Sequence, residues 1–156
     1  MVQNVQLSQN FWLSELVKSS TADRLGIDNW PTEQYVVDNL VTTATHVLQP
    51  IRDHFGRPIA PNSGFRSLPL NRALKSKDTS QHVQGQAVDV EVPGVGNYDL
   101  AEWVQDNLDF DQLLLEFYYP GQPTSGWVHV SYVSPDQNRN QVLTINKNGA
   151  FNGLLT

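Results

Sequence analysis

The fold and the chemistry of this chain are decided by one ten-residue stretch: Ser80-Gln81-His82-Val83-Gln84-Gly85-Gln86-Ala87-Val88-Asp89. It holds a histidine and an aspartate, and a second histidine, His129, follows downstream. A catalytic zinc ion takes three protein ligands from His, Asp, Glu or Cys and leaves a fourth position open for the water that it acidifies. Because His82, Asp89 and His129 make up such a set, the sequence predicts a metal site of the hydrolytic kind.

The alternation of side chains along strands places these residues on one side of an expected sheet. Asp89 alternates with the valines of its segment, which is typical of a half-buried strand. His129 also stands opposite two flanking valines, and Glu116 lies in a similar apolar run. Gly85 supplies the flexible turn by which His82, on a loop, folds back toward Asp89. We therefore expect these side chains to face a common cleft.

Helical patterns dominate the first third of the chain. The apolar positions of residues 11–27 are interrupted by three hydroxyl residues, which predicts two short helices with a capped restart. Beyond Pro31, at an expected first helical turn, apolar residues recur at helical spacing over residues 36–51 and predict the longest helix. We expect Pro50 to kink or end this helix, and Gly56 to close it.

Short apolar runs separated by turn residues follow and predict strands. We expect these strands at residues 59–60, 87–92, 112–118, 127–133 and 141–145. Between them, residues 70–74 predict a helical turn, and Asp99 with Glu102 begins a further helix in an arrangement like a capping box. The predicted fold class is α+β, with N-terminal helices packed on a mostly antiparallel sheet.

Length and charge limit the architecture and the partners. A chain of 156 residues predicts a single domain, residues 1–156, with a helical part at about 9–56 and a catalytic core at about 58–146. Ten Lys and Arg against sixteen Asp and Glu give a formal charge of −6, which disfavours binding to nucleic acid. The absence of cysteine excludes disulfides and thiolate ligands. We expect a monomer.

The residues from Ser80 to Asp89 contain the complete signature Ser-x-His-x-x-Gly-x-Ala-x-Asp. In this the chain resembles the zinc D-alanyl-D-alanine carboxypeptidases and the related phage endolysin peptidases, which share a fold with the hedgehog signalling domain. Upstream, the segment around Arg66 is similar to the part of these proteins that carries an active-site arginine. The resemblance covers roughly residues 58–132, and residues 11–40 are similar to small phage-type members.

The resemblance implies a zinc-dependent peptidase with one zinc ion, held by His82, Asp89 and His129. It also implies that Glu116 is the general base and acid, and that Arg66 binds the substrate or the oxyanion. The implied substrates are the stem peptides of bacterial peptidoglycan, cut by a D,D-carboxypeptidase or by an endopeptidase of the endolysin type. The sequence leaves open whether the bond is of the D,D or the L,D type, and whether cleavage is exo or endo.

Two departures from the family pattern concern substrate contacts. Many relatives carry His-x-His on the strand of the third ligand, whereas this chain has Trp127 at the first of these positions. We interpret Trp127 as a wall of the cleft and, with Ser80, as a candidate substrate contact. Where relatives often carry glycines before the signature, the chain has Lys75-Ser76-Lys77-Asp78-Thr79. Substrate contacts of relatives on that loop therefore do not transfer.

Two alternatives stay open. The first is a non-catalytic zinc-binding module on the same fold, against which the presence of Glu116 and Arg66 argues. The second is a structural or virion protein that binds the cell wall, in which residues 117–119, all aromatic, form either cleft wall or core. The sequence shows neither a secretory signal nor a membrane span. We expect a phage-encoded protein made in the bacterial cytoplasm, without membrane insertion, that reaches the wall after release by another factor.

Overall fold

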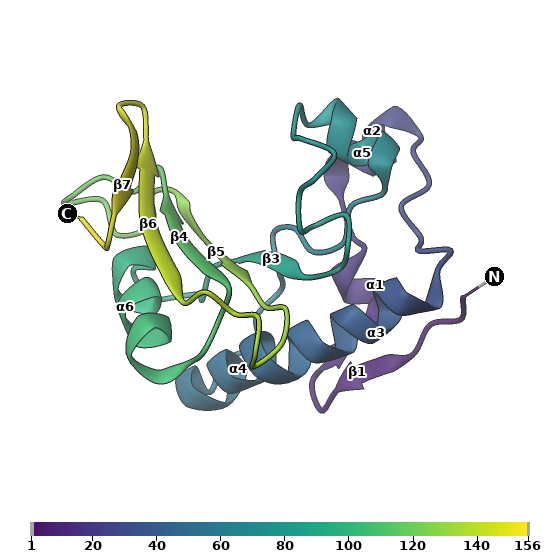
Figure 1. The fold of residues 1–156 in the computed structure, drawn as a ribbon, viewed down its shortest axis with the longest axis horizontal. Coiled ribbons are helices and arrows are strands. Elements are labelled where there is room, and N and C mark those ends of the chain that lie inside the picture. The colour runs from purple at the N-terminus through teal and green to yellow at the C-terminus, as the bar shows by residue number, and fades with distance from the viewer. Residues whose placement is uncertain (1, 156) are drawn as a thin grey trace.

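A five-stranded sheet forms one end of the molecule in the computed structural model, which describes residues 2–155 (Figure 1). The strand order is β3-β5-β4-β6-β7. Of the four strand pairs in this sheet, β4 and β6 run parallel and the other three are antiparallel. The strands are β3 (Ala87–Val90), β4 (Gln112–Glu116), β5 (Trp127–Ser131), β6 (Gln141–Asn146) and β7 (Gly149–Asn152).

Helices occupy the N-terminal part, as expected, so the mixed α/β class is confirmed. A two-stranded sheet that the sequence did not predict precedes them. The capped restart between the first two helices is confirmed, because Ser19 Oγ accepts a hydrogen bond from the Ala22 N–H at 3.1 Å. The elements are β1 (Gln6–Ser8), β2 (Phe11–Trp12), α1 (Leu13–Leu16), α2 (Ser20–Leu25), α5 (Leu68–Ala73) and α6 (Asn97–Asn107).

One long helix runs beneath both ends of the molecule and joins them (Figure 1). It consists of α3 (Gln34–Thr43), the π-helical segment η1 (Ala44–Leu48) and α4 (Gln49–Phe55). Pro50 does not end it, so of the two predicted outcomes, a kink or an end, the end is wrong. Pro50 has no N–H for the carbonyl one turn earlier and its ring crowds that carbonyl, and the wider π turn relieves the conflict. Gly56, with φ of 62°, closes the helix as expected.

Other elements also differ from the sequence prediction, and β3, β4 and β5 each end two residues earlier than expected. Residues 59–60 form no strand; instead Ser63 bridges to Asp89 at the start of the site. Helix α6 starts after Gly96, so Asp99 lies inside its first turn rather than at its cap. Strand β7 was not predicted, because its residues are exposed and show no alternation. The division into one domain with two parts stays a prediction, as does the finer likeness to the hedgehog fold.

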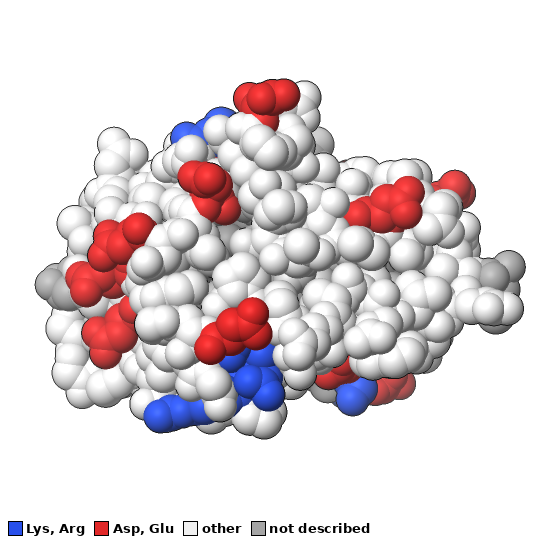
Figure 2. Space-filling model, turned by 90° about the horizontal axis from the view of Figure 1, so that it is seen from below, with Lys and Arg blue, Asp and Glu red and all other residues white. Residues whose placement is uncertain are grey.

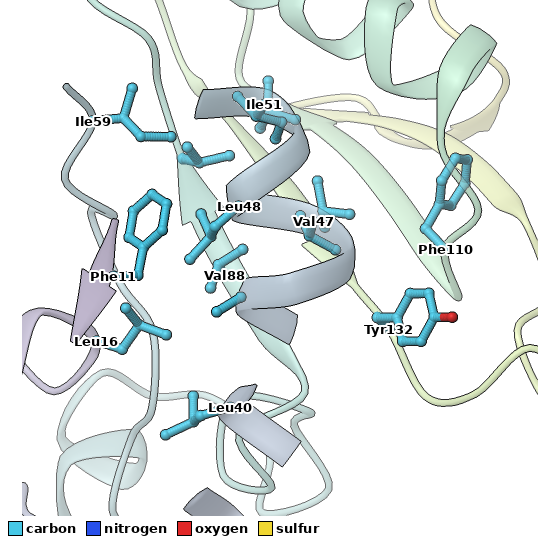
Figure 3. Close-up of a cluster of buried hydrophobic side chains, with 14 of the residues drawn as sticks. Phe11, Leu16, Leu40, Val47, Leu48, Ile51, Ile59, Val88, Phe110 and Tyr132 are labelled. Carbon is cyan, nitrogen blue, oxygen red and sulfur yellow. The ribbon is translucent and has the colours of Figure 1, made fainter. Parts of the chain in front are cut away.

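The hydrophobic core lies between the long helix, the N-terminal segment and one face of the sheet (Figure 3). Phe11 and Leu16 meet Leu48 of the long helix and Val88 of β3 in this core. Helix α6 packs against β4 and β5. The opposite face of the same strands is thereby left for polar side chains. Among the described residues, no helix is both long and apolar enough to span a bilayer.

Candidate metal centre

Three side chains from two strands and a loop meet on the polar face of the sheet. His82, Asp89 and His129 each offer a ligand atom, and these atoms lie within 4.8 Å of one another. Asp89 stands between the imidazoles: its Oδ1 is 3.0 Å from His129 Nδ1 and its Oδ2 is 3.4 Å from His82 Nε2. A tetrahedral ion with bonds of about 2.0–2.1 Å spaces its ligand atoms about 3.3 Å apart. The donor set and its spacing therefore fit a zinc ion.

Strand pairing brings two of the three ligands together. Asp89 on β3 is the direct antiparallel partner of His129 on β5, so their side chains share a face at close range. His82 comes from the loop before β3, and Arg66 N–H donates to its carbonyl at 3.1 Å. Gly85 lets this loop turn back, with φ of 74°, and a Cβ there would lie 2.8 Å from the carbonyl oxygen of Val36. The glycine of the signature is thus required by backbone shape.

A backbone carbonyl orients the first ligand. His82 Nδ1 lies 2.7 Å from the carbonyl oxygen of Gly64, which makes Nδ1 the protonated nitrogen and leaves Nε2 free to bind a metal. Gly64 itself lies against the end of α1, where only a glycine fits, because a Cβ would collide with the carbonyl oxygen of Leu16. The next residue, Phe65, donates its N–H to that same Leu16 oxygen at 2.8 Å. Helix α1 thereby sets the position of the ligand.

Burial and charge place these groups in the protonation states that metal binding requires. All three ligand side chains are nearly buried, with exposures of 3% for His82, 7% for Asp89 and 9% for His129. Burial lowers the pKa of His82, which favours the neutral imidazole. Burial raises the pKa of Asp89, but its polar contacts with His129 and His82 outweigh this effect and hold the pKa well below the usual range. The carboxylate is therefore ionised, as a ligand must be.

Arg66 is fixed beside the ligand carboxylate. Its Nε–H donates to Ser63 Oγ at 3.0 Å, and a terminal nitrogen lies 3.3 Å from Asp89 Oδ2. Burial lowers its pKa, while the charges of Asp89 and Glu116 raise it. Since a guanidinium stays charged in proteins, a permanent positive charge stands next to the ligand set.

Glu116 ends β4 on the same face as His129. It pairs with Trp127, two positions from His129 on β5, so Glu116 and His129 are diagonal neighbours on the sheet. Glu116 is half-buried. Burial raises its pKa, and the charge of Asp89 also raises it, against the opposing effects of His129 and Arg66. A carboxyl group with a raised pKa, next to a metal site, is suited to exchanging protons near neutral pH.

Residues 9–131 match the protein family described as Peptidase M15. The chain belongs to the M15 peptidase family. The resemblance noted in the sequence is confirmed by this match. Among curated proteins, none matches the chain. M15 peptidases depend on zinc, and His82, Asp89 and His129 provide a set that can bind it. The roles of the individual residues stay predictions, because family membership does not test them.

The two remaining candidate residues of this M15 peptidase, Ser80 and Trp127, lie on opposite sides of the ligands. Ser80 Oγ accepts a hydrogen bond from the His82 N–H at 3.3 Å, so Ser80 shapes the turn that carries the ligand. Trp127 is half-buried and packs against Phe117, with ring centroids 5.5 Å apart. Tyr118 instead packs near Tyr98, at 6.0 Å. Of the aromatic residues 117–119, Phe117 therefore lies beside Trp127 at the cleft, whereas Tyr118 packs against the hydrophobic core.

Two cavities open on either side of the ligand set. The helix-side cavity, of about 260 Å³, lies toward α2 and α5 and is lined by Ser19, Ser20, Thr21, Asn62, Ser63, Arg66, Leu74, Asp89, Glu91 and Trp127. The sheet-side cavity, of about 670 Å³, is lined by Ser76, Lys77, Thr79, Ser80, Gln81, Gln112, Leu114, His129, Arg139, Leu143 and Ile145. Because Asp89 lines the first and His129 the second, a substrate at the ligands can extend into both.

Sequence reasoning missed several residues that hold the site in place. Ser63 and Gly64 lie in the segment whose resemblance to the family pointed only to Arg66, and their contacts, made through a short side chain and a backbone carbonyl, were not predicted. Asp111 binds Arg139 and Gln81, which lie far from it in sequence, with contacts between 2.7 and 2.9 Å. Since a lone Asp before a strand is common, only the folded structure identifies this link.

Proposed function

We propose that this M15 peptidase is a zinc metallopeptidase that hydrolyses peptide bonds in the stem peptides of bacterial peptidoglycan. The observation that carries the proposal is the buried Asp89 carboxylate, with imidazole nitrogens at 3.0 and 3.4 Å. Family membership supports the peptidase class. The proposal includes a hedgehog-like fold, a phage-encoded origin, action as a monomer, and either D,D-carboxypeptidase or endolysin-type endopeptidase cleavage.

In this mechanism His82, Asp89 and His129 hold the ion, and Glu116 moves the proton. Bound zinc supplies Lewis acidity and lowers the pKa of a water molecule to about 7. The Glu116 carboxylate accepts the proton of the attacking water and later donates it to the leaving amine. Because burial raises the pKa of Glu116, this side chain binds the proton more readily than an exposed glutamate does.

Arg66 positions the substrate in the proposed reaction. Its guanidinium is held by Ser63 and Asp89, so its charge has a fixed place at the edge of the helix-side cavity. A fixed positive charge stabilises the negative oxygen that develops when a peptide carbonyl is attacked, since the donor needs no reorganisation during the reaction. The same charge attracts a substrate carboxylate.

A digest of purified peptidoglycan by the zinc-loaded protein, analysed by mass spectrometry, tests the function. We expect new amino termini or released D-alanine, without new reducing sugar ends. Zinc-loaded protein with Glu116→Gln serves as the control and should release about 100-fold less product. Sugar ends alone would overturn the proposal, because they are products of glycan cleavage. No cleavage with zinc bound would also overturn it and favour a zinc-binding or wall-binding module on the same fold.

A further inference from the structure

The sheet-side cavity is built largely by segments that depart from the family pattern. Lys77 belongs to the loop where relatives often carry glycines. Arg139, Leu143 and Ile145 come from the C-terminal segment, which lies beyond the matched residues 9–131. The family match therefore does not describe this part of the cavity lining.

Strand β6 extends the active face of the sheet with apolar side chains. In the parallel pairing of β4 and β6, Leu143 lies opposite Leu114 and Ile145 lies opposite Glu116. Leu114 is in turn the partner of His129 on β5. Because paired residues share a face of the sheet, Leu114 and Leu143 continue the row that starts at the ligand His129. They form an apolar floor directly beside the expected metal.

Two cations and no acid line this cavity, although the chain as a whole is acidic. The net charge is −6, and acidic side chains are spread over the face seen in Figure 2. Of the described residues that line the sheet-side cavity, Lys77 and Arg139 are charged and none is Asp or Glu. The helix-side cavity instead has Asp89 and Glu91 against the single cation Arg66. The side chains that line the two cavities thus carry opposite net charge, before the charge of the expected metal ion between them is counted.

Arg139 is held in place by a buried carboxylate. Asp111, only 2% exposed, accepts hydrogen bonds from Arg139 at 2.8 and 2.7 Å and from the Gln81 side chain at 2.9 Å. The Arg139 side chain keeps 57% of its surface exposed. With Asp111 counted, the sheet side carries one net positive charge, since +1 for Lys77, +1 for Arg139 and −1 for Asp111 give +1.

We propose that the sheet-side cavity binds the acidic segment of the peptide substrate, with a substrate carboxylate captured by Lys77 and Arg139. The aliphatic part of that segment lies on Leu114 and Leu143. This inference rests on the proposed function and gives the substrate a direction, with its carboxylate-bearing side over β6 and its other side toward Glu91. Neighbouring residues that share a strand face are about 6.6–6.8 Å apart, which is also the repeat of an extended peptide substrate.

The test uses binding to a zinc-loaded protein that carries Glu116→Gln, so that no cleavage occurs. The probes are three synthetic stem peptides: one with all carboxylates free, one with its terminal carboxylate amidated, and one with its side-chain carboxylates amidated. The variant is Lys77→Glu, at an exposed position that lines the cavity. The control is Lys75→Glu, the same charge change at an exposed position of the same loop outside the cavity lining. Calorimetric titration gives each dissociation constant.

We expect Lys77→Glu to weaken binding of the free peptide on the order of tenfold, and Lys75→Glu to change it less than about twofold. One of the two amidated peptides should bind the protein with Lys77 intact more weakly than the free peptide does, and Lys77→Glu should not weaken its binding further. Which of the two behaves in this way shows whether the captured carboxylate is the terminal one or a side-chain one. Equal effects of both lysine variants, no effect of either amidation, or no binding of any peptide overturn the inference.

Cleavage measured in parallel, with Glu116 intact, separates the two proposals. If the parent digests peptidoglycan but Lys77→Glu and Lys75→Glu behave alike, the charge inference fails and the peptidase function stands. If peptides bind in a way that depends on Lys77 but are never cut, the binding site stands and the peptidase function fails.

Discussion

The two faces of the five-stranded sheet are stabilised by different interactions, although the residues near the site are buried on both faces. Val88 and Val130 lie fully buried on one face, against the core. Asp89 and His129 lie on the other at 7% and 9% exposure, and their close contacts are polar. Burial of apolar surface stabilises the first face, whereas burial of charge costs free energy unless it is compensated. The strands therefore gain stability from one face and hold the residues of the metal site on the other.

The largest expected effect comes from removing a ligand on the polar face. His129→Ala should reduce the zinc content from about one ion per chain to near zero and abolish turnover, because two ligands hold zinc far more weakly than three. Elemental analysis measures the metal. His54→Ala, at an exposed histidine on α4, should leave the zinc content unchanged. Equal zinc in both variants would remove His129 from the ligand set.

Chelation extends this test to stability. Removing zinc from the parent should lower its melting temperature, since a ligand that binds only the folded state stabilises it by mass action. The same chelator should leave the melting temperature of His129→Ala unchanged, because that variant holds no zinc. An equal fall in melting temperature in both proteins would mean that the chelator does not act through zinc bound by His129.

The second largest effect separates the base from the ligands. Glu116→Gln should keep its zinc and lose about 100-fold or more in turnover, because an amide cannot accept the proton of the attacking water. Glu102→Gln makes the same change at an exposed position on α6 and should have normal activity. Zinc loss in Glu116→Gln would make Glu116 a ligand, and unchanged turnover would exclude it from catalysis.

On the core face, a substitution should lower the stability of the fold and leave the zinc content unchanged. Leu115 is fully buried on the opposite face of β4 from Glu116. Leu115→Ala should lower the free energy of unfolding by about 3 kcal/mol, from lost burial and the cavity that remains. Leu25→Ala, at a leucine that is 49% exposed, should cost less than about 0.5 kcal/mol. Urea denaturation gives the first result, and unchanged zinc content in folded Leu115→Ala would show that the two faces are independent.

The sequence predicted the parts of the site that local rules control. Alternation placed Asp89 and His129 on one face, and the signature glycine marked the turn before Asp89, which Gly85 indeed makes. Composition and periodicity could not show that the long helix absorbs Pro50 by a π segment, because that outcome depends on packing along the whole helix. Nor could they show that Arg139 reaches the active face, because its partner Asp111 becomes its neighbour only after β4 and β6 pair.

The smallest expected effect concerns the ion pair of Asp111 and Arg139, a polar contact that, unlike the ligand set, needs no metal. Hydrogen bonds from Arg139, against the opposing effect of burial and with help from Gln81, lower the pKa of Asp111 from 3.8 to about 2. A carboxyl whose pKa is lower in the folded state stabilises the fold above its unfolded pKa, and the contribution is lost as the pH falls from about 4 to about 2.

At pH 7 in chelator, Asp111→Asn should therefore lower the free energy of unfolding by about 1 kcal/mol, a value reduced for the solvent exposure of Arg139. Near pH 2 the difference from the parent should vanish. Asp109→Asn, the same change at an exposed neighbour, is the control and should change the free energy of unfolding at pH 7 by less than about 0.5 kcal/mol. A penalty for Asp111→Asn that is the same at both pH values would mean that Asp111 acts through packing rather than charge.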